Sequence, residues 1–110
     1  MNIKKDEQEI IFTEADNHKG AVLIDTLNGA KNGFCMGISY YHWDTFGEPG
    51  IHDDQEGFFV LEGTGYAKIG EEVFPIHPGL SFIAHAGAPH TIRKNKDSEP
   101  IKILWCHGAI

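Results

Sequence analysis

Short runs of β-forming residues alternate with turn residues along nearly the whole chain. Asn28-Gly29 and Pro78-Gly79 are two of the turn signals that separate these runs. Strands at such a regular, short spacing are typical of a β-sandwich or β-barrel. We therefore predict strands at residues 9–12, 21–27, 34–41, 58–61, 65–69, 72–76, 80–84, 91–93 and 101–106.

Helices are expected to contribute little. No long segment repeats its apolar residues with the period of a helix, and the best helical candidate, residues 4–10, is polar on nearly every side. The simplest assembly is an all-β jelly roll of about eight strands. We divide the chain into an N-terminal extension with a possible short strand (1–20) and one barrel domain (21–110).

The run at residues 58–61 is apolar at every position. A strand of this kind is expected to have both faces covered, by the opposite sheet or by a partner subunit. A small barrel also has a high ratio of surface to volume, and burying such a strand against a second copy reduces it. We therefore predict a homodimer.

Length and charge narrow the class of protein. The chain has 110 residues, enough for one domain with one core. Nine basic and sixteen acidic residues give a net charge of −7, so we expect no binding to nucleic acid or to anionic membranes. The charged N-terminus lacks the apolar stretch of a secretory signal, which favours a cytoplasmic location. Cys35 and Cys106 are therefore predicted to be buried free thiols.

The segment 52–90 contains the residues with the clearest chemistry. In an extended strand His52, Asp54 and Glu56 project to one side, because side chains alternate with a period of two. Phe58 and Val60 continue that side, so polar groups at the mouth of a pocket would lead to apolar side chains deeper inside. A second histidine, which follows a Gly-Ala-Pro turn, would reach the same pocket from another strand. That residue is His90.

Together these two stretches resemble the motifs of the cupin superfamily. The first motif is Gly-x5-His-x-His-x3–4-Glu-x6-Gly, and the spacing of His52, Glu56 and Gly63 agrees with it. The second motif is Gly-x5-Pro-x-Gly-x2-His-x3-Asn, which is matched at its two glycines and its histidine. The matching residues there are Gly79, Gly87 and His90.

Several motif positions depart from the pattern. Gly50 stands where the motif has its first histidine, and Asp44 stands at the leading glycine. His85 replaces the proline of the second motif, and Asn95 comes one place late for the closing asparagine. The resemblance covers residues 33 to 107 and is more specific for the fold than for the metal site.

The resemblance implies a metal site whose ligands are His52, Glu56 and His90. Two imidazoles and one carboxylate leave open positions for water, substrate or dioxygen. This set of ligands suits Fe(II), and it is also compatible with Mn(II), Ni(II) or Zn(II). The alternative is a weak or empty site, a polar pocket that holds no metal.

Other residues have weaker roles in this scheme. Asp54 is either a fourth ligand or a solvated carboxylate, and His85 either orients a substrate or lies in a surface turn. Tyr40 is a possible pocket residue, because an aromatic ring with a polar tip can hold a ligand. The remaining histidines are expected to lie in the core, at the rim or in turns, outside the ligand set. They are His18, His42, His77 and His107.

Two functions remain open. The first is a metal-dependent barrel protein that acts on or holds a small polar molecule, for example as an isomerase, lyase or dioxygenase. The second is a non-catalytic module that binds or senses a small ligand. The chain has no nucleophile elbow, P-loop or dinucleotide fingerprint. Cys106 and His107 are neighbours on a predicted strand, so they face opposite sides and cannot form a nucleophile–base pair.

Overall fold

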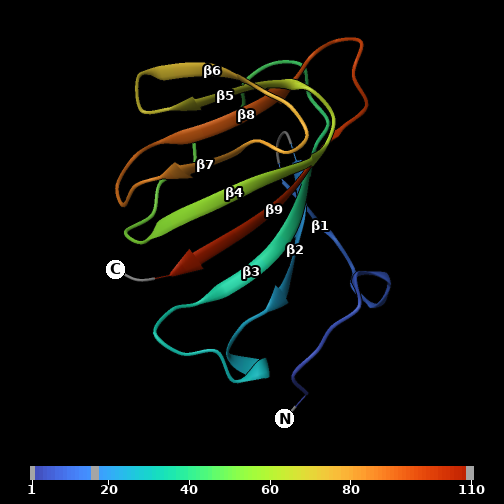
Figure 1. Ribbon diagram of the computed structural model, residues 1–110, viewed down its shortest axis with the longest axis vertical. Helices are drawn as coiled ribbons and strands as arrows, with labels where there is room; N and C mark the ends of the chain where they lie inside the picture. The colour runs from blue at the N-terminus through green and yellow to red at the C-terminus, as the bar shows by residue number, and fades with distance from the viewer. Residues whose placement is uncertain (1, 16–17, 109–110) are drawn as a thin grey trace.

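Nearly all the regular structure is β-strand in the computed structural model, which describes residues 2–15 and 18–108 (Figure 1). Two three-residue 3-10 helices, η1 (Glu7–Glu9) and η2 (Thr26–Asn28), are the only helical elements in these ranges. The strands are β1 (Thr13–Glu14), β2 (His18–Ile24), β3 (Cys35–Tyr41), β4 (Gln55–Glu62), β5 (Gly65–Ile69), β6 (Glu72–Ile76), β7 (Ser81–Ala84), β8 (His90–Lys94) and β9 (Ile101–Gly108).

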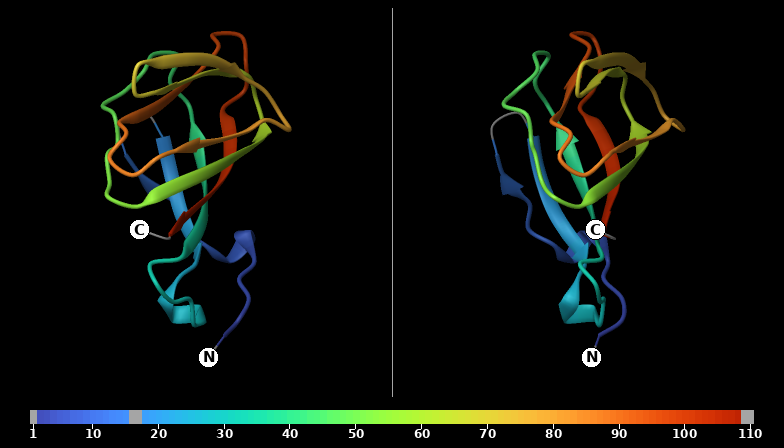
Figure 2. Two further views of the ribbon diagram at one scale, coloured as in Figure 1. Left: turned by 60° about the vertical axis from the view of Figure 1, so that its left-hand side comes forward. Right: turned by 90° about the vertical axis from the view of Figure 1, so that its left-hand side faces the viewer.

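The strands form two antiparallel sheets that fold over one another (Figure 2). One sheet has the order β1-β2-β3-β9-β4-β7, and the other has the order β6-β5-β8. Strands distant in sequence are therefore neighbours, as β9 lies between β3 and β4. This arrangement confirms the predicted all-β jelly roll.

The core lies between the two sheets, and this explains why buried and more exposed side chains alternate along the strands. Val60 on β4 and Ile103 on β9 are Cα partners, and neither has any exposed surface. Phe58 stacks on Phe82 at 4.8 Å between ring centroids. The rest of the buried apolar cluster comes from both sheets: Ala67, Ile76, Ala84, Ile92 and Ile101.

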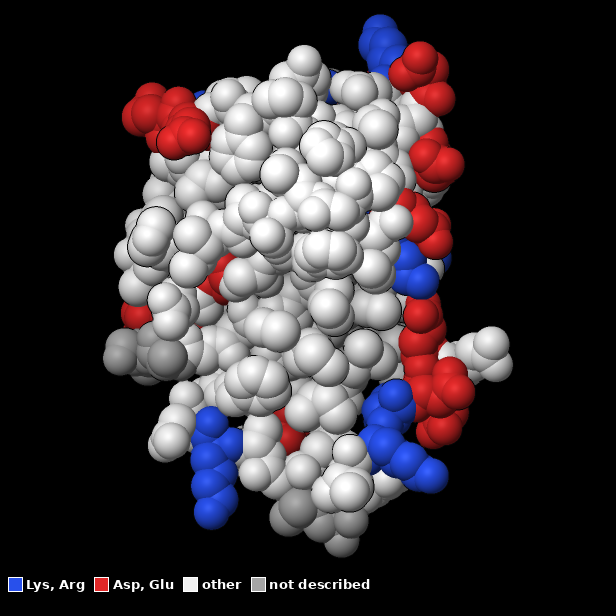
Figure 3. Space-filling model, viewed as in Figure 1, with Lys and Arg blue, Asp and Glu red and all other residues white. Residues whose placement is uncertain are grey.

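β4 does not have both faces covered within one chain. Phe58 and Val60 are buried, but Phe59 and Leu61 are 42% and 38% exposed. The sheet therefore has one face on the core and one face outside, the usual pattern of an antiparallel sheet. In Figure 3 the centre of the visible face is almost free of charged residues, which lie mainly at its margins.

The N-terminal segment corrects one predicted strand. Residues 9–12 do not form a strand, because the chain turns through η1, where the Asp6 side chain accepts a hydrogen bond from the Gln8 backbone N–H. The predicted strand at 21–27 also ends early, at Ile24, since Asp25 caps η2 through a capping box. Glu7 then forms an ion pair of 3.0 Å with Lys102 of β9.

Two further expectations can be compared with the fold. Cys35 and Cys106 are free thiols, as predicted, but both are half-buried rather than buried. None of the helices in the described part of the chain is long and apolar enough to cross a membrane.

Candidate metal centre

Glu56 is the buried acid around which the site is built. It lies near the start of β4 with only 6% of its surface exposed, and its Cα partner on β9 is His107. The Nε2 atom of His107 is 3.2 Å from Glu56 Oε2. Strand pairing therefore fixes an imidazole opposite a carboxylate on the inner face of the sheet.

Two more histidines reach the other oxygen of this carboxylate. His52 Nε2 lies 3.0 Å and His90 Nε2 lies 3.2 Å from Glu56 Oε1. Backbone hydrogen bonds hold both segments in place. Gly50 and His90 each donate to the other's carbonyl at 2.9 Å, and the Gly87 N–H donates to the His52 carbonyl at 2.8 Å.

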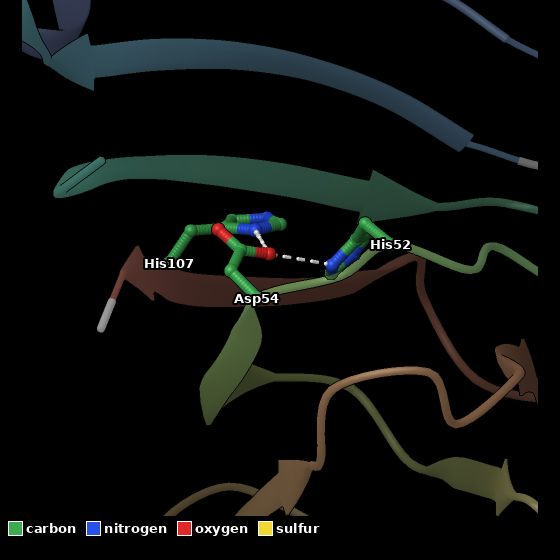
Figure 4. Close-up of side chains that lie close together, drawn as sticks. All are labelled: His52, Asp54 and His107. Carbon is green, nitrogen blue, oxygen red and sulfur yellow. Dashed lines mark hydrogen bonds and ion pairs between the residues drawn. The ribbon is translucent and has the colours of Figure 1, made fainter. Parts of the chain in front are cut away.

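Asp54 lies between two of the imidazole rings (Figure 4). Its Oδ1 atom is 2.8 Å from His52 Nδ1 and 3.2 Å from His107 Nδ1. Burial raises the pKa of this carboxyl, but the hydrogen bonds and charges of His107 and His52 outweigh burial, so the pKa of Asp54 lies below its usual value. An ionised carboxylate only accepts hydrogen bonds, so both rings donate to Asp54 from Nδ1.

The third ring, that of His90, also bears its hydrogen on Nδ1. His90 Nδ1 is 3.1 Å from the carbonyl oxygen of Ala88, which can only accept, so this nitrogen also bears a hydrogen. In a neutral imidazole with Nδ1–H, the other nitrogen is a lone-pair donor. The Nε2 atoms of His52, His90 and His107 thus direct lone pairs toward Glu56.

Lone pairs and a carboxylate that face each other at about 3 Å repel unless a cation lies among them. The neutral imidazole nitrogens of His52 and His90 and the anionic oxygen of Glu56 form a donor set that fits a borderline divalent metal ion. The site also attracts protons: burial lowers the pKa of His90, but its hydrogen bonds to Glu56 and Ala88 and the negative charge of Glu56 together outweigh burial, so the pKa lies above its usual value. The donor set therefore fits the metal that the sequence motifs imply.

Aromatic side chains enclose the site. Trp105 packs edge-on against His107 at 5.1 Å between ring centroids, and its Nε1–H donates to Ser39 Oγ at 2.9 Å. Phe58 lies 5.8 Å from the ring of His90. Burial raises the pKa of Tyr41, and the negative charge of Glu56 raises it further, so this phenol stays protonated.

The fold, the motif spacing and the donor cluster indicate one family, and a direct comparison supports it. A family model described as a cupin domain matches residues 43–107, more than half of the chain. The chain belongs to the cupin family. No match to a protein of curated function was found by sequence.

Solved structures share the cupin fold at low sequence identity. The polyketide cyclase RemF from Streptomyces resistomycificus is 17% identical, with 98% of this chain and 80% of RemF superposed at a TM-score of 0.82. KdgF from Halomonas sp. is 12% identical, with 100% and 96% covered at a TM-score of 0.77. A structure described as FeII HppE is 18% identical, with 96% and 59% covered at 0.76. At these identities the likeness concerns the fold.

The structure brings together the three residues that the cupin motifs indicate. The donor atoms of His52, Glu56 and His90 all lie within 4.8 Å of one another. Asp54 is neither remote nor a freely solvated carboxylate, because its side chain is 19% exposed and contacts two rings. A second group of donors within the same distance overlaps the first, and it consists of His52, Asp54 and His107.

Two predicted pocket residues lie elsewhere. Tyr40 is on the outer face, where its ring packs edge-on against Phe12 and its hydroxyl is 3.5 Å from Glu7. The inward residue of that pair is Tyr41, because neighbours on a strand face opposite sides. His85 is exposed in the turn before β8 and lines a hollow with Phe74 and Leu80 rather than the site.

The remaining histidines divide into two groups. His107, expected in the core or at the rim, is half-buried and contacts both Glu56 and Asp54. His18, expected in a loop, begins β2 and stacks on Tyr41 at 4.9 Å between ring centroids. His42 lies edge-on to Trp43, and His77 is exposed; neither belongs to a donor group among the residues that the structure describes.

The register of β4 and β9 is the signal that would have identified His107. Its proximity to Glu56 cannot be read from local spacing, because 50 residues lie between Glu56 and His107 in the sequence. Only the pairing of Cys106 with Gly57 and of His107 with Glu56 shows that the histidine faces inward while the cysteine faces outward.

Proposed function

We propose that this cupin binds a divalent metal ion through His52, Glu56 and His90 and uses it to hold or transform a small polar molecule. The observation that supports the proposal best is the burial of Glu56, 6% exposed, among imidazole nitrogens at 3.0 to 3.2 Å. A buried carboxylate is stable only when it is paired, and a metal ion pairs it with the same nitrogens that already surround it.

The metal would supply Lewis acidity toward an oxygen atom of the bound molecule. The protein's own residues would do the rest. His52 and His90 supply neutral nitrogen donors and Glu56 supplies the anionic donor. Tyr41, kept protonated beside Glu56, is available as a hydrogen-bond donor, while Phe58 keeps one side of the site apolar.

The structural relatives are consistent with an enzyme of this kind. RemF is described as a polyketide cyclase, one further neighbour as ectoine synthase, and HppE was solved in a form described as FeII. A metal of the group Fe, Mn, Ni or Zn is therefore proposed here, with Fe(II) favoured because a histidine–histidine–carboxylate set suits it. A small-molecule substrate is proposed on the same grounds.

Metal analysis tests the proposal directly. Protein purified without chelator is offered Fe(II), Mn(II), Ni(II) and Zn(II) in turn, and the bound metal is measured by elemental analysis. We expect about one ion per chain. His52→Ala and His90→Ala should each lose most of it, whereas the exposed His77, replaced by alanine, should leave it bound. Failure of the wild type to bind any of the four metals would refute the proposal.

A non-catalytic ligand-binding role is the second candidate, and one observation favours it. A groove of about 630 Å³ lies beside β2 and reaches Ser39 and Trp105, and Glu56 is not among the residues that line it. That volume is within the usual range of small-ligand sites. A thermal-shift screen of metabolites separates the two roles: stabilisation that survives chelation indicates the groove, and stabilisation that requires metal indicates the metal centre.

A further inference from the structure

Gly50 stands where the cupin motif has its first histidine, and it lies close to a nitrogen of the proposed site. The Gly50 backbone is bonded to His90, and a β-carbon there would lie 3.2 Å from His90 Nε2. A side chain at residue 50 would therefore press on a nitrogen that the metal needs. With glycine at residue 50, a fourth nitrogen donor would come from another strand.

His107 on β9 meets this requirement. Its Nε2 atom is 3.2 Å from Glu56 Oε2, and its ring lies 4.4 Å from the ring of His52, centroid to centroid. Trp105 packs against one edge of the ring. The side chain is only 19% exposed, so the imidazole is held in this orientation rather than free in solvent.

Asp54 determines which nitrogen of His107 is available. Its Oδ1 atom accepts Nδ1–H from both His52 and His107, which leaves the Nε2 lone pairs of both rings on the side of Glu56. A carboxylate behind a histidine ligand fixes the tautomer and the ring orientation. One acidic side chain thus orients two rings at once.

We infer that His107 is the fourth metal ligand, through Nε2, in place of the absent motif histidine, and that Asp54 is a positioning residue for His52 and His107. The inference rests on the proposed metal function and specifies its ligand set. It differs from an alternative in which Asp54 itself binds the metal together with His107, as the second donor group would allow.

Cobalt(II) is a suitable probe, since its visible absorption depends on the number and kind of ligands. Affinity is measured by competition with a chromophoric chelator, and the spectrum is recorded at saturation. His107→Ala should weaken Co(II) binding by more than about tenfold and change the saturated spectrum. Adding free imidazole to His107→Gly should restore the spectrum. Cys106→Ala, on the same strand but facing outward, is the matched control and should behave as wild type.

Asp54→Asn should weaken binding by about 10- to 100-fold while the saturated spectrum stays that of the wild type, as expected for an orienting residue. A changed spectrum in Asp54→Asn would instead make Asp54 a ligand and overturn its positioning role. If His107→Ala keeps the wild-type affinity and spectrum while His52→Ala no longer binds Co(II), the role of His107 is overturned. The proposed function is then left intact. Absence of Co(II) binding by the wild type would overturn both. Circular dichroism of each variant identifies misfolding, and His107→Gln provides a second test if His107→Ala does not fold.

Discussion

Gly50 and His90 exchange two backbone hydrogen bonds of 2.9 Å, and together they form an isolated β-bridge between the first motif and β8. The bridge holds His90 Nε2 so close to residue 50 that a β-carbon there would lie 3.2 Å away. The chain therefore joins its two half-motifs through the backbone at the position where other cupin motifs have a ligand side chain.

The first prediction tests this contact. In Gly50→Ala the new methyl group should displace the His90 ring by a few tenths of an ångström and weaken metal binding by up to about tenfold, because small misplacements of a site group are costly. Competition with a chromophoric chelator measures the affinity. Gly57→Ala is the control, since a β-carbon there meets nothing within 4 Å. Unchanged affinity in Gly50→Ala would contradict the prediction.

The second prediction concerns metal removal. A ligand that binds only the folded state stabilises it by mass action, by about 2.7 kcal/mol when its free concentration is 100 times Kd. Chelator should therefore lower the melting temperature of the metal-loaded wild type. The same treatment should do little to His52→Ala, which has lost one of its imidazole donors. Equal shifts in the two proteins would mean that the metal acts elsewhere.

The third prediction is a pH dependence of opposite sign in the metal-free and metal-loaded protein. Burial lowers the pKa of His90, but the hydrogen bonds to Glu56 and Ala88 and the charge of Glu56 together outweigh burial, so the pKa is raised from 6.5. In the metal-free protein this group's stabilisation is full below pH 6.5 and is lost as the pH rises through the folded-state pKa. Metal binding requires the neutral ring, so it strengthens over the same interval.

The difference in melting temperature between loaded and chelated protein should therefore grow from about pH 5 to about pH 8. Differential scanning calorimetry with and without chelator measures it. His77→Ala should follow the wild-type curve, because that exposed histidine lies outside the donor groups. A difference that stays constant over this range would argue against histidine ligation.

The sequence predicted what depends on local periodicity and spacing. Strands β5 and β6 were predicted residue for residue at 65–69 and 72–76, because tight turns and alternating side chains mark their ends. His52, Glu56 and His90 were predicted because motif spacing carries them. The inward direction of His52 and Asp54 was also anticipated, although regular strand begins only at Gln55.

What the sequence could not predict depends on contacts between distant segments. His107 faces Glu56 only through the register of β4 and β9, and this register is absent from any local pattern. Tyr40 and Tyr41 are adjacent aromatic residues, and the sequence alone does not show which of them faces the pocket. The packing of Phe12 on Tyr40 shows that Tyr40 is the one that faces outward. The continuous apolar run of β4 concealed an exposed face for the same reason.

The fourth prediction tests close packing beside the site. A β-carbon at Gly37 would clash with the Trp105 ring and with the Ala21 carbonyl oxygen. Gly37→Ala should therefore destabilise the fold by about 1–3 kcal/mol through overpacking. Gly57→Ala should be neutral or slightly stabilising, because alanine costs less conformational entropy than glycine in a strand and has free space at this position. Urea unfolding of both variants gives the free energies, and similar values for the two would refute the packing argument.

The last prediction is that the protein is a homodimer joined through the outer face of the larger sheet. Phe59, Leu61 and Ile83 are 42%, 38% and 42% exposed there, and strand pairing puts Phe59 and Ile83 on the same side. A groove of about 470 Å³ between them is lined by Leu104 and Cys106 of β9. A second copy would cover this apolar face, which carries few charges to oppose association.

Sedimentation equilibrium at micromolar concentration should therefore give twice the chain mass of 12.2 kDa. Ile83→Lys places a charge in the proposed interface and should give the single-chain mass, because an unpaired buried charge is costly. Val73→Lys is the matched control: Val73 is 52% exposed on β6 of the smaller sheet, so this variant should remain dimeric. A wild type that sediments as one chain would refute the dimer. Dissociation by Val73→Lys with no effect of Ile83→Lys would move the interface to the smaller sheet.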